Sequence, residues 1–187
     1  MIKLANYIKS LIDIDEKDLS IILSNFNKKE LSKGSYILKH GQVASSYYFI
    51  DSGALKIFSD EEPNDKTLWI AFENEFIAEL PSLKFQTESH FNFQAIEDTT
   101  LITIESEKME QLYIRFPQWQ EFGRHIWEKA FLRVVEHVLL LQTQNATERY
   151  RKAVLETEFI HRVPLKYLSS YLGITQTSLS RLRKKIK

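Results

Sequence analysis

The spacing of apolar residues changes along the chain, and this change constrains the fold more than any other feature of the sequence. Between residues 34 and 105, apolar and aromatic residues come in short runs separated by turn residues such as Gly41 and Gly53. Between residues 117 and 142 they recur every three or four positions. The first spacing is typical of an antiparallel sheet and the second of a helix. The sequence therefore predicts a β domain followed by one long helix.

The runs that predict strands are rich in aromatic and β-branched residues, and their spacing is that of an antiparallel sandwich or barrel. They cover residues 36–38, 47–50, 55–58, 68–72, 91–95 and 101–104. Residues 1 to about 30 have helical spacing, with Asp15, Glu16 and Asp18 placed where acids favour the helix dipole. An opening helix is therefore expected before the strands.

Composition excludes several kinds of site. The 187 residues contain no cysteine, so disulfides, thiolate iron–sulfur clusters and cysteine zinc sites are ruled out. No apolar stretch approaches the ~20 residues that a membrane-spanning helix needs. The N-terminus does not resemble a signal peptide. We therefore expect a folded cytoplasmic protein that has no membrane partner.

The long helical pattern carries two neighbouring apolar rows, which is more than a helix lying on one sheet requires. We expect one row to cover the β domain and the other to pack against the same helix of a second subunit. The predicted dimer interface consists of Phe122, Ile126, Ala130, Val134, Val138 and Leu141. The alternative is a helix buried in the core of one monomer.

A break is expected after this helix, at residues 145–148. Asn145 is a good N-cap residue, and Glu148 follows at the spacing of a capping box. The sequence therefore predicts a hinge near Asn145 and a new helix beyond it.

Residues 164–184 have the pattern of two short helices joined by a tight turn. Such a pair needs apolar inner faces, a small residue where the backbones cross, and a turn residue that tolerates positive φ. Ser169 suits the crossing, Gly173 suits the turn, and Thr175 can cap the second helix. The inner faces are supplied by Leu165, Leu168, Leu172, Ile174, Leu179 and Leu182.

The polar face left outside this hairpin carries the candidate DNA-binding residues, and no carboxylate lies among them. They are Thr175, Gln176, Thr177, Ser180, Arg181 and Lys184. In the major groove, glutamine can pair bidentately with adenine and arginine with guanine, while hydroxyls reach phosphates or base edges. The alternative is a basic face that is only solvated.

The charge distribution supports the DNA interpretation. Residues 161–187 contain seven Lys or Arg and no Asp or Glu, so this segment sums to +7 and the rest of the neutral chain to −7. Arg183, Lys185 and Lys187 lie beside the candidate reading face, where they can contact phosphates.

The order of β domain, long helix and helix-turn-helix resembles the Crp/Fnr transcriptional regulators across nearly the whole chain. Residues 37–42, 48–53 and 76–80 resemble the family's cyclic-nucleotide-binding β-roll. Residues 172–184 resemble the recognition end of a short-tailed branch that is common among Bacteroidetes.

The resemblance implies an α+β fold in which an antiparallel β-roll, a double-stranded β-helix, is followed by a long dimerisation helix and a C-terminal helix-turn-helix. The implied units are a sensor domain over residues 1–115, the dimerisation helix over 116–143 and a DNA-binding domain over 144–187. The family usually adds a β-hairpin wing, whereas this sequence ends at Lys187, so a wingless domain is expected. The implied partners are double-stranded DNA, a second copy of the chain and, as a further candidate, RNA polymerase.

The resemblance also tests whether cyclic AMP fits. Ligand-binding relatives use a Glu for the ribose and an Arg-Ser pair for the cyclic phosphate. Glu79 matches the first, but Ser89 and His90 stand in place of the pair, and Val134 and Val135 replace hydroxyl residues on the long helix. Without its arginine, a buried phosphate keeps an unneutralised charge. Cyclic AMP is therefore not the expected effector, and another ligand or none at all are both left open.

Other functions lack the residues they require. The sequence has no His-x-His metal pair, phosphate-gripping glycine loop or Gly-x-Ser-x-Gly elbow, so we do not expect an enzyme. Its five histidines form no pair at metal-ligand spacing, and neither a metal nor a cofactor is expected. The remaining alternative is a ligand-sensing β-roll that acts through protein partners, with a C-terminal hairpin that does not bind DNA.

Overall fold

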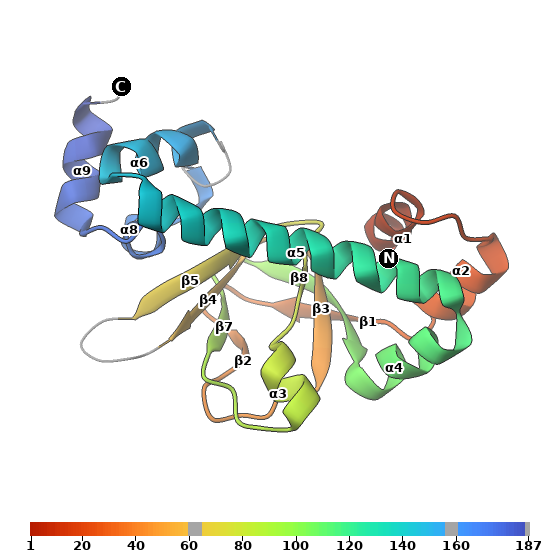
Figure 1. Cartoon of the computed structure of the whole chain (residues 1–187). Helices are drawn as coiled ribbons and strands as arrows, with labels where there is room; N and C mark the ends of the chain where they lie inside the picture. Colours follow the sequence, from red (N-terminus) through yellow and green to blue (C-terminus); the bar gives the residue numbers. More distant parts are fainter. Residues whose placement is uncertain (60–64, 156–160, 186–187) are drawn as a thin grey trace.

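The computed structural model describes residues 1–59, 65–155 and 161–185, and its centre is a β-roll of two four-stranded antiparallel sheets (Figure 1). One sheet has the order β1-β8-β3-β6 and the other β2-β7-β4-β5. The strands are β1 (Asn27–Leu31), β2 (Tyr36–Leu38), β3 (Ser46–Ser52), β4 (Leu55–Ser59), β5 (Lys66–Ala71), β6 (Phe76–Ile77), β7 (Asn92–Ala95) and β8 (Thr99–Glu105). The predicted α+β class with an antiparallel β-roll is confirmed.

The helices flank the roll and extend beyond it. They are α1 (Ile2–Lys9), α2 (Glu16–Leu23), α3 (Leu80–Phe85), α4 (Ser106–Arg115), α5 (Pro117–Thr143), α6 (Ala146–Leu155), α8 (Leu165–Tyr171) and α9 (Gln176–Lys185). Figure 1 shows α5 running across the roll from α4 and α2 at one end to α6, α8 and α9 at the other. Pro117 occupies the first turn of α5, where its missing N–H costs no hydrogen bond.

The single opening helix expected over residues 1 to about 30 is wrong in its extent. Two helices occupy this stretch, and the Asp15 carboxylate accepts a hydrogen bond from the Asp18 N–H at the start of α2. Residues 27–31 form β1, which pairs with β8 from Asn27–Thr103 to Leu31–Thr99. Four of the five side chains in β1 are exposed, so no apolar alternation marks it as a strand.

One side of the long helix faces its own chain along the whole length, and Arg133 and His137 continue on the second half the contacts that begin near Trp119. Trp119, Phe122 and Ile126 are buried against the roll and α1, and Trp119 stacks on Phe122 with ring centroids 4.4 Å apart. The prediction that Phe122 and Ile126 belong to a dimer interface is wrong, because one chain alone leaves them 0% and 4% exposed.

Both apolar rows emerge on the second half of α5. The exposed apolar residues there are Phe131, Leu132, Val134, Val135, Val138, Leu139 and Leu141. At about 100° per residue they span roughly 180° of the helix. Val134, Val138 and Leu141 of the predicted interface are among them, whereas Phe122 and Ile126 of the same row are buried against the roll.

Candidate nucleic-acid interface and effector site

The C-terminal hairpin has the predicted turn. Gly173 takes a φ of +65°, a conformation that favours glycine, between α8 and α9. The Thr175 hydroxyl accepts a hydrogen bond from the Ser178 N–H and so caps α9. Leu168, Leu172 and Leu179 are buried between the helices. A helix-turn-helix is therefore present, with its crossing residue Ser169 also buried.

The structure brings the candidate DNA-binding residues together on one side of α9. Gln176, Thr177, Arg181 and Lys184 are exposed, Ser180 is partly exposed, and Thr175 is exposed at the cap. At about 100° per residue, the five residues within α9 fall in an arc of roughly 140°. Lys185 is exposed beside them, whereas Lys187 lies outside the described residues. This surface has the polar and basic chemistry that base edges and phosphates require.

The hinge before the hairpin is capped as predicted. The Asn145 side-chain oxygen accepts hydrogen bonds from the N–H groups of Thr147 and Glu148, and the Glu148 carboxylate accepts one from the Asn145 N–H. These reciprocal bonds make a capping box at the start of α6. Arg149 donates to the carbonyls of Leu141 and Gln144, so it satisfies the C-terminal end of α5.

The hairpin packs against the β-roll of its own chain through α8 and β5. The Ser170 hydroxyl accepts a hydrogen bond from the Thr67 N–H and donates one to the Asp65 carbonyl. Lys56 of β4 is buried beneath the Tyr167 ring, with 4.1 Å from its Nζ to the ring centroid, and lies 3.8 Å from the Asp65 carboxylate. Burial lowers the pKa of Lys56 to about 8, although Asp65 opposes this shift.

A second set of contacts joins the hairpin to the roll through Arg162. This guanidinium donates to the Glu73 carboxylate at 2.9 Å and also to the Glu97 carboxylate. Burial raises the pKa of Glu73, but hydrogen bonds from Arg162 and from backbone N–H groups outweigh burial and hold this pKa below its ordinary value. Nothing in the sequence pairs Arg162 with Glu73, because 89 residues separate them.

Trp69 of β5 connects three elements. Its ring lies edge-on to both His137 of α5 and Tyr171 of α8, and His137 stacks on Tyr171 with centroids 4.3 Å apart. Arg133 of α5 lies over the same indole, 4.8 Å from its centroid. Burial and the charge of Lys152 lower the pKa of His137, so its neutral form is favoured in this stack. The long helix, the roll and the hairpin therefore share one aromatic cluster.

The residues matched to the cyclic-phosphate site bond to their own chain. The buried Glu79 carboxylate accepts a hydrogen bond from the Ser82 N–H and caps α3. The buried Ser89 hydroxyl bonds to the backbone of Phe91, and His90 is exposed next to His40. No Lys or Arg occurs between residues 85 and 100. These residues do not fit a cyclic phosphate, which needs a cation within its pocket.

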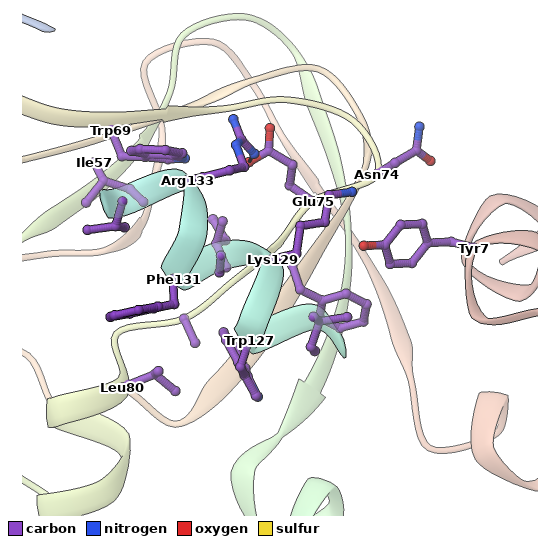
Figure 2. A pocket seen from close by; sticks show the side chains of 16 residues that line it. Tyr7, Ile57, Trp69, Asn74, Glu75, Leu80, Trp127, Lys129, Phe131 and Arg133 are labelled. Carbon is purple, nitrogen blue, oxygen red and sulfur yellow. Dashed lines mark ion pairs between the residues drawn. The ribbon is translucent and has the colours of Figure 1, made fainter. Parts of the chain in front are cut away.

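A cavity of about 530 Å³ lies between α5 and the strands β5 and β6 (Figure 2). Among the predicted ligand residues only Val134 lines it; Glu79, Ser89, His90 and Val135 do not. Sequence reasoning missed Tyr7, Glu75, Lys129 and Arg133, which come from three separate elements or turns. Lys129 and Arg133 share one side of α5 at helical spacing, but no spacing rule links them to Tyr7 or Glu75.

Comparison with known proteins agrees with this arrangement. Residues 28–116 match the cyclic nucleotide-binding domain family. The transcriptional activator protein Anr of Pseudomonas protegens is 25% identical over 168 residues, which are 82% of this chain and 68% of Anr. The fumarate and nitrate reduction regulatory protein of Vibrio cholerae is 28% identical over 83% of this chain and 66% of its own length. The chain is thus similar to Crp/Fnr-type transcription regulators over more than four fifths of its length.

Solved structures show the same fold at lower identity. FixK2 of Bradyrhizobium japonicum superposes with a TM-score of 0.72 at 19% identity, over 86% of this chain and 84% of its own. The c-di-GMP-responsive regulator CLP of Xanthomonas campestris gives 0.70 at 16% identity, over 92% and 91%. Within the described part of this chain, no helix is long and apolar enough to cross a membrane.

Proposed function

We propose that this chain is a homodimeric, sequence-specific DNA-binding regulator of the Crp/Fnr type that acts in the cytoplasm, and that cyclic AMP is not its effector. The exposed face of α9 supports the DNA interaction most directly, because it gathers Gln176, Arg181 and short hydroxyls without a carboxylate. In this proposal residues 1–115 form the sensor domain, residues 116–143 form the dimerisation helix, and residues 144–187 form the DNA-binding domain. RNA polymerase is the further partner. No catalytic step is involved.

Dimerisation is supported by the exposed apolar face on the second half of α5. Val134, Val138 and Leu141 of the predicted interface lie on this face, together with Phe131 and Leu139. A contiguous apolar face of this kind marks a protein interface in a soluble protein. A two-fold dimer built on it would place two α9 helices in successive major grooves, so the bound sequence should be a palindrome with half-sites about 34 to 36 Å apart.

The absence of a cyclic-AMP response is supported by the engaged carboxylate of Glu79 and by Ser89 and His90, which stand in place of the Arg-Ser pair. We expect cyclic AMP to leave both DNA affinity and thermal stability unchanged at millimolar concentration. A rise in melting temperature with added cyclic AMP would contradict this part of the proposal.

The decisive experiment is selection of bound sequences from random duplex DNA by the purified protein, which reports binding, symmetry and site length together. DNA affinity should fall steeply between about 50 and 200 mM salt, because several phosphates are contacted. Retention of no duplex at low salt would favour the alternative in which the hairpin binds protein partners.

The variant Arg181→Ala distinguishes recognition of a specific base from general electrostatic attraction to DNA. We expect it to relax preference at one base pair of the selected site by roughly 1 to 3 kcal/mol, because a bidentate pair is lost. Lys185→Ala, the matched control on the same exposed helix end, should weaken specific and random DNA alike. Fluorescence anisotropy with both duplexes measures the two effects. Identical behaviour of the two variants would show that the reading face is assigned incorrectly.

A further inference from the structure

A cleft of about 70 Å³ lies where the end of α5 meets α6, α8 and the strand β5 (Figure 1). The basic groups of its lining come from α5 and α6, and they are Arg133, His137, Arg149 and Lys152. Among the lining residues in the described part of the chain, only Glu136 carries a carboxylate. The junction of the long helix and the hairpin therefore contains a mostly basic cleft.

Two of the cations in this cleft have no carboxylate to balance them. Arg133 is paired with the Glu75 carboxylate at 2.5 Å. Arg149 and Lys152, in contrast, form no ion pair with any carboxylate of the described residues. Burial and then the charge of Lys152 lower the pKa of His137, so this charge acts within the cleft. Even with the lining carboxylate counted, a net charge of about +1 is left, which suits an anion.

The Arg149 guanidinium also has a buried N–H that lacks an acceptor. Its Nη1 donates to the carbonyls of Leu141 at 3.1 Å and Gln144 at 3.0 Å. Its Nε is buried and bonds to no atom of the described residues. A buried donor on a charged group is costly to leave unpaired, so an acceptor from outside the chain is expected here.

The size and the donors of the cleft define its ligand. A volume of about 70 Å³ holds a few water-sized groups, whereas pockets for drug-sized organic ligands begin at roughly 300 Å³. Guanidinium and ammonium groups bind phosphate oxygens through charge-assisted hydrogen bonds. The ligand that fits is therefore a small oxyanion rather than a nucleotide.

This cleft is distinct from the sites described above. The candidate DNA-binding residues do not line it, and neither do the residues matched to the cyclic-phosphate site. Trp69 and Arg133 also border the cavity of about 530 Å³. The unpaired donors, however, belong to α6, and no residue of α6 lines that cavity.

We propose that this cleft binds one free inorganic phosphate ion, or an oxyanion of the same shape such as sulfate, whose oxygens accept hydrogen bonds from Arg149 Nε and Lys152 Nζ. The bound ion joins α6 to α5 across the hinge, because α5 supplies the rest of the basic lining. This inference goes beyond the proposed function, and the binding requires no DNA.

Equilibrium dialysis with radiolabelled inorganic phosphate tests the binding, using the full chain without DNA in a chloride buffer. One phosphate per chain should bind, with a dissociation constant of about 1 mM or lower. Lys152→Met should weaken this binding about tenfold, because a charge-assisted hydrogen bond is lost. Arg151→Met is the matched control: it removes the same charge from the next residue of α6, which is exposed and does not line the cleft, so it should bind phosphate as wild type does.

A second variant, Arg149→Lys, tests the unpaired donor. It keeps the positive charge but removes the Nε–H, and it should weaken phosphate binding at least tenfold. Circular dichroism and the melting temperature show whether each variant is folded. The proposal is overturned if wild type shows no saturable phosphate binding, if folded Lys152→Met or Arg149→Lys binds as wild type does, or if Arg151→Met weakens binding as much as Lys152→Met.

A DNA phosphate is the other source of the same chemistry. With the selected duplex added at saturation, a free phosphate ion should stay bound to its cleft. Displacement of the ion would assign the cleft to the DNA backbone and overturn the proposal. Phosphate binding by a chain that retains no duplex would reject the proposed function alone.

Discussion

Lys56 shows how one side chain can link the sensor to the hairpin. It extends from β4 into a space closed by the rings of Phe58 and Tyr167, whose faces, together with the Asp65 carboxylate, offset part of the cost of burying its charge. A lysine in the pattern Leu-Lys-Ile-Phe of a strand would ordinarily face solvent. The sequence could not predict its burial, because the covering ring lies 111 residues further along the chain.

The lowered pKa of Lys56 predicts a specific pH dependence of stability. Between about pH 8 and pH 10.5, the unfolded chain holds a proton that folded Lys56 has released, so the free energy of unfolding rises with pH through this window. Below pH 8 the contribution is constant. Denaturant unfolding of wild type and Lys56→Met should therefore show a difference that grows in favour of wild type from pH 8 to 10.5. Lys17→Met should show no such trend, and a flat difference for Lys56→Met would contradict the burial.

Helices and strands were predicted well where their side chains have a regular period or a cap. Pro117, Asn145 and Gly173 each mark an element boundary that the structure confirms. The shorter or more polar elements were missed: β1 is mostly exposed, β6 has two residues, and α3 and α4 follow strands without a clear change of period. In these elements the pairing partner decides the conformation rather than local sequence.

The contact between Arg162 and Glu73 should hold the hairpin against the roll. A double-mutant cycle with Arg162→Met and Glu73→Gln should give a coupling of about 1 to 3 kcal/mol, because the pair is partly buried and bidentate. The exposed pair Arg124–Glu128 on α5 is the matched control, with about 0.5 kcal/mol or less expected. Equal couplings in the two cycles, measured by denaturant unfolding, would show that Arg162 contributes no more than a surface pair.

The assembly depends on how α5 is shared between the chain's own core and a partner. The two apolar rows predicted a double role for this helix, and that part of the interpretation stands as a proposal. Periodicity could not show which residues take each role, because a row of four-residue steps drifts around the helix by about 40° per step and so carries Phe122 and Val138 to different sides. Burial of Phe122 and exposure of Val138 follow from that geometry rather than from residue type.

Val138→Asp should convert the proposed dimer to monomers. A carboxylate in an apolar seam must be desolvated or protonated, which costs several kcal/mol for the pair. Sedimentation velocity would detect the change, and circular dichroism would show an intact fold, since Val138 is 45% exposed in one chain. Ile114→Asp, at an 83% exposed position on α4, should remain dimeric. A dimer unaffected by Val138→Asp would place the interface elsewhere.

The apolar cluster beneath α8 draws on both halves of the chain, with Ile70 and Phe72 from the roll and Leu168 and Leu172 from the hairpin. Cutting the chain after α5 would expose these apolar residues to water, and both fragments would tend to aggregate. The two halves should therefore melt in one cooperative transition. A DNA-binding hairpin taken from another regulator would function in this chain only if its first helix also packed against β5.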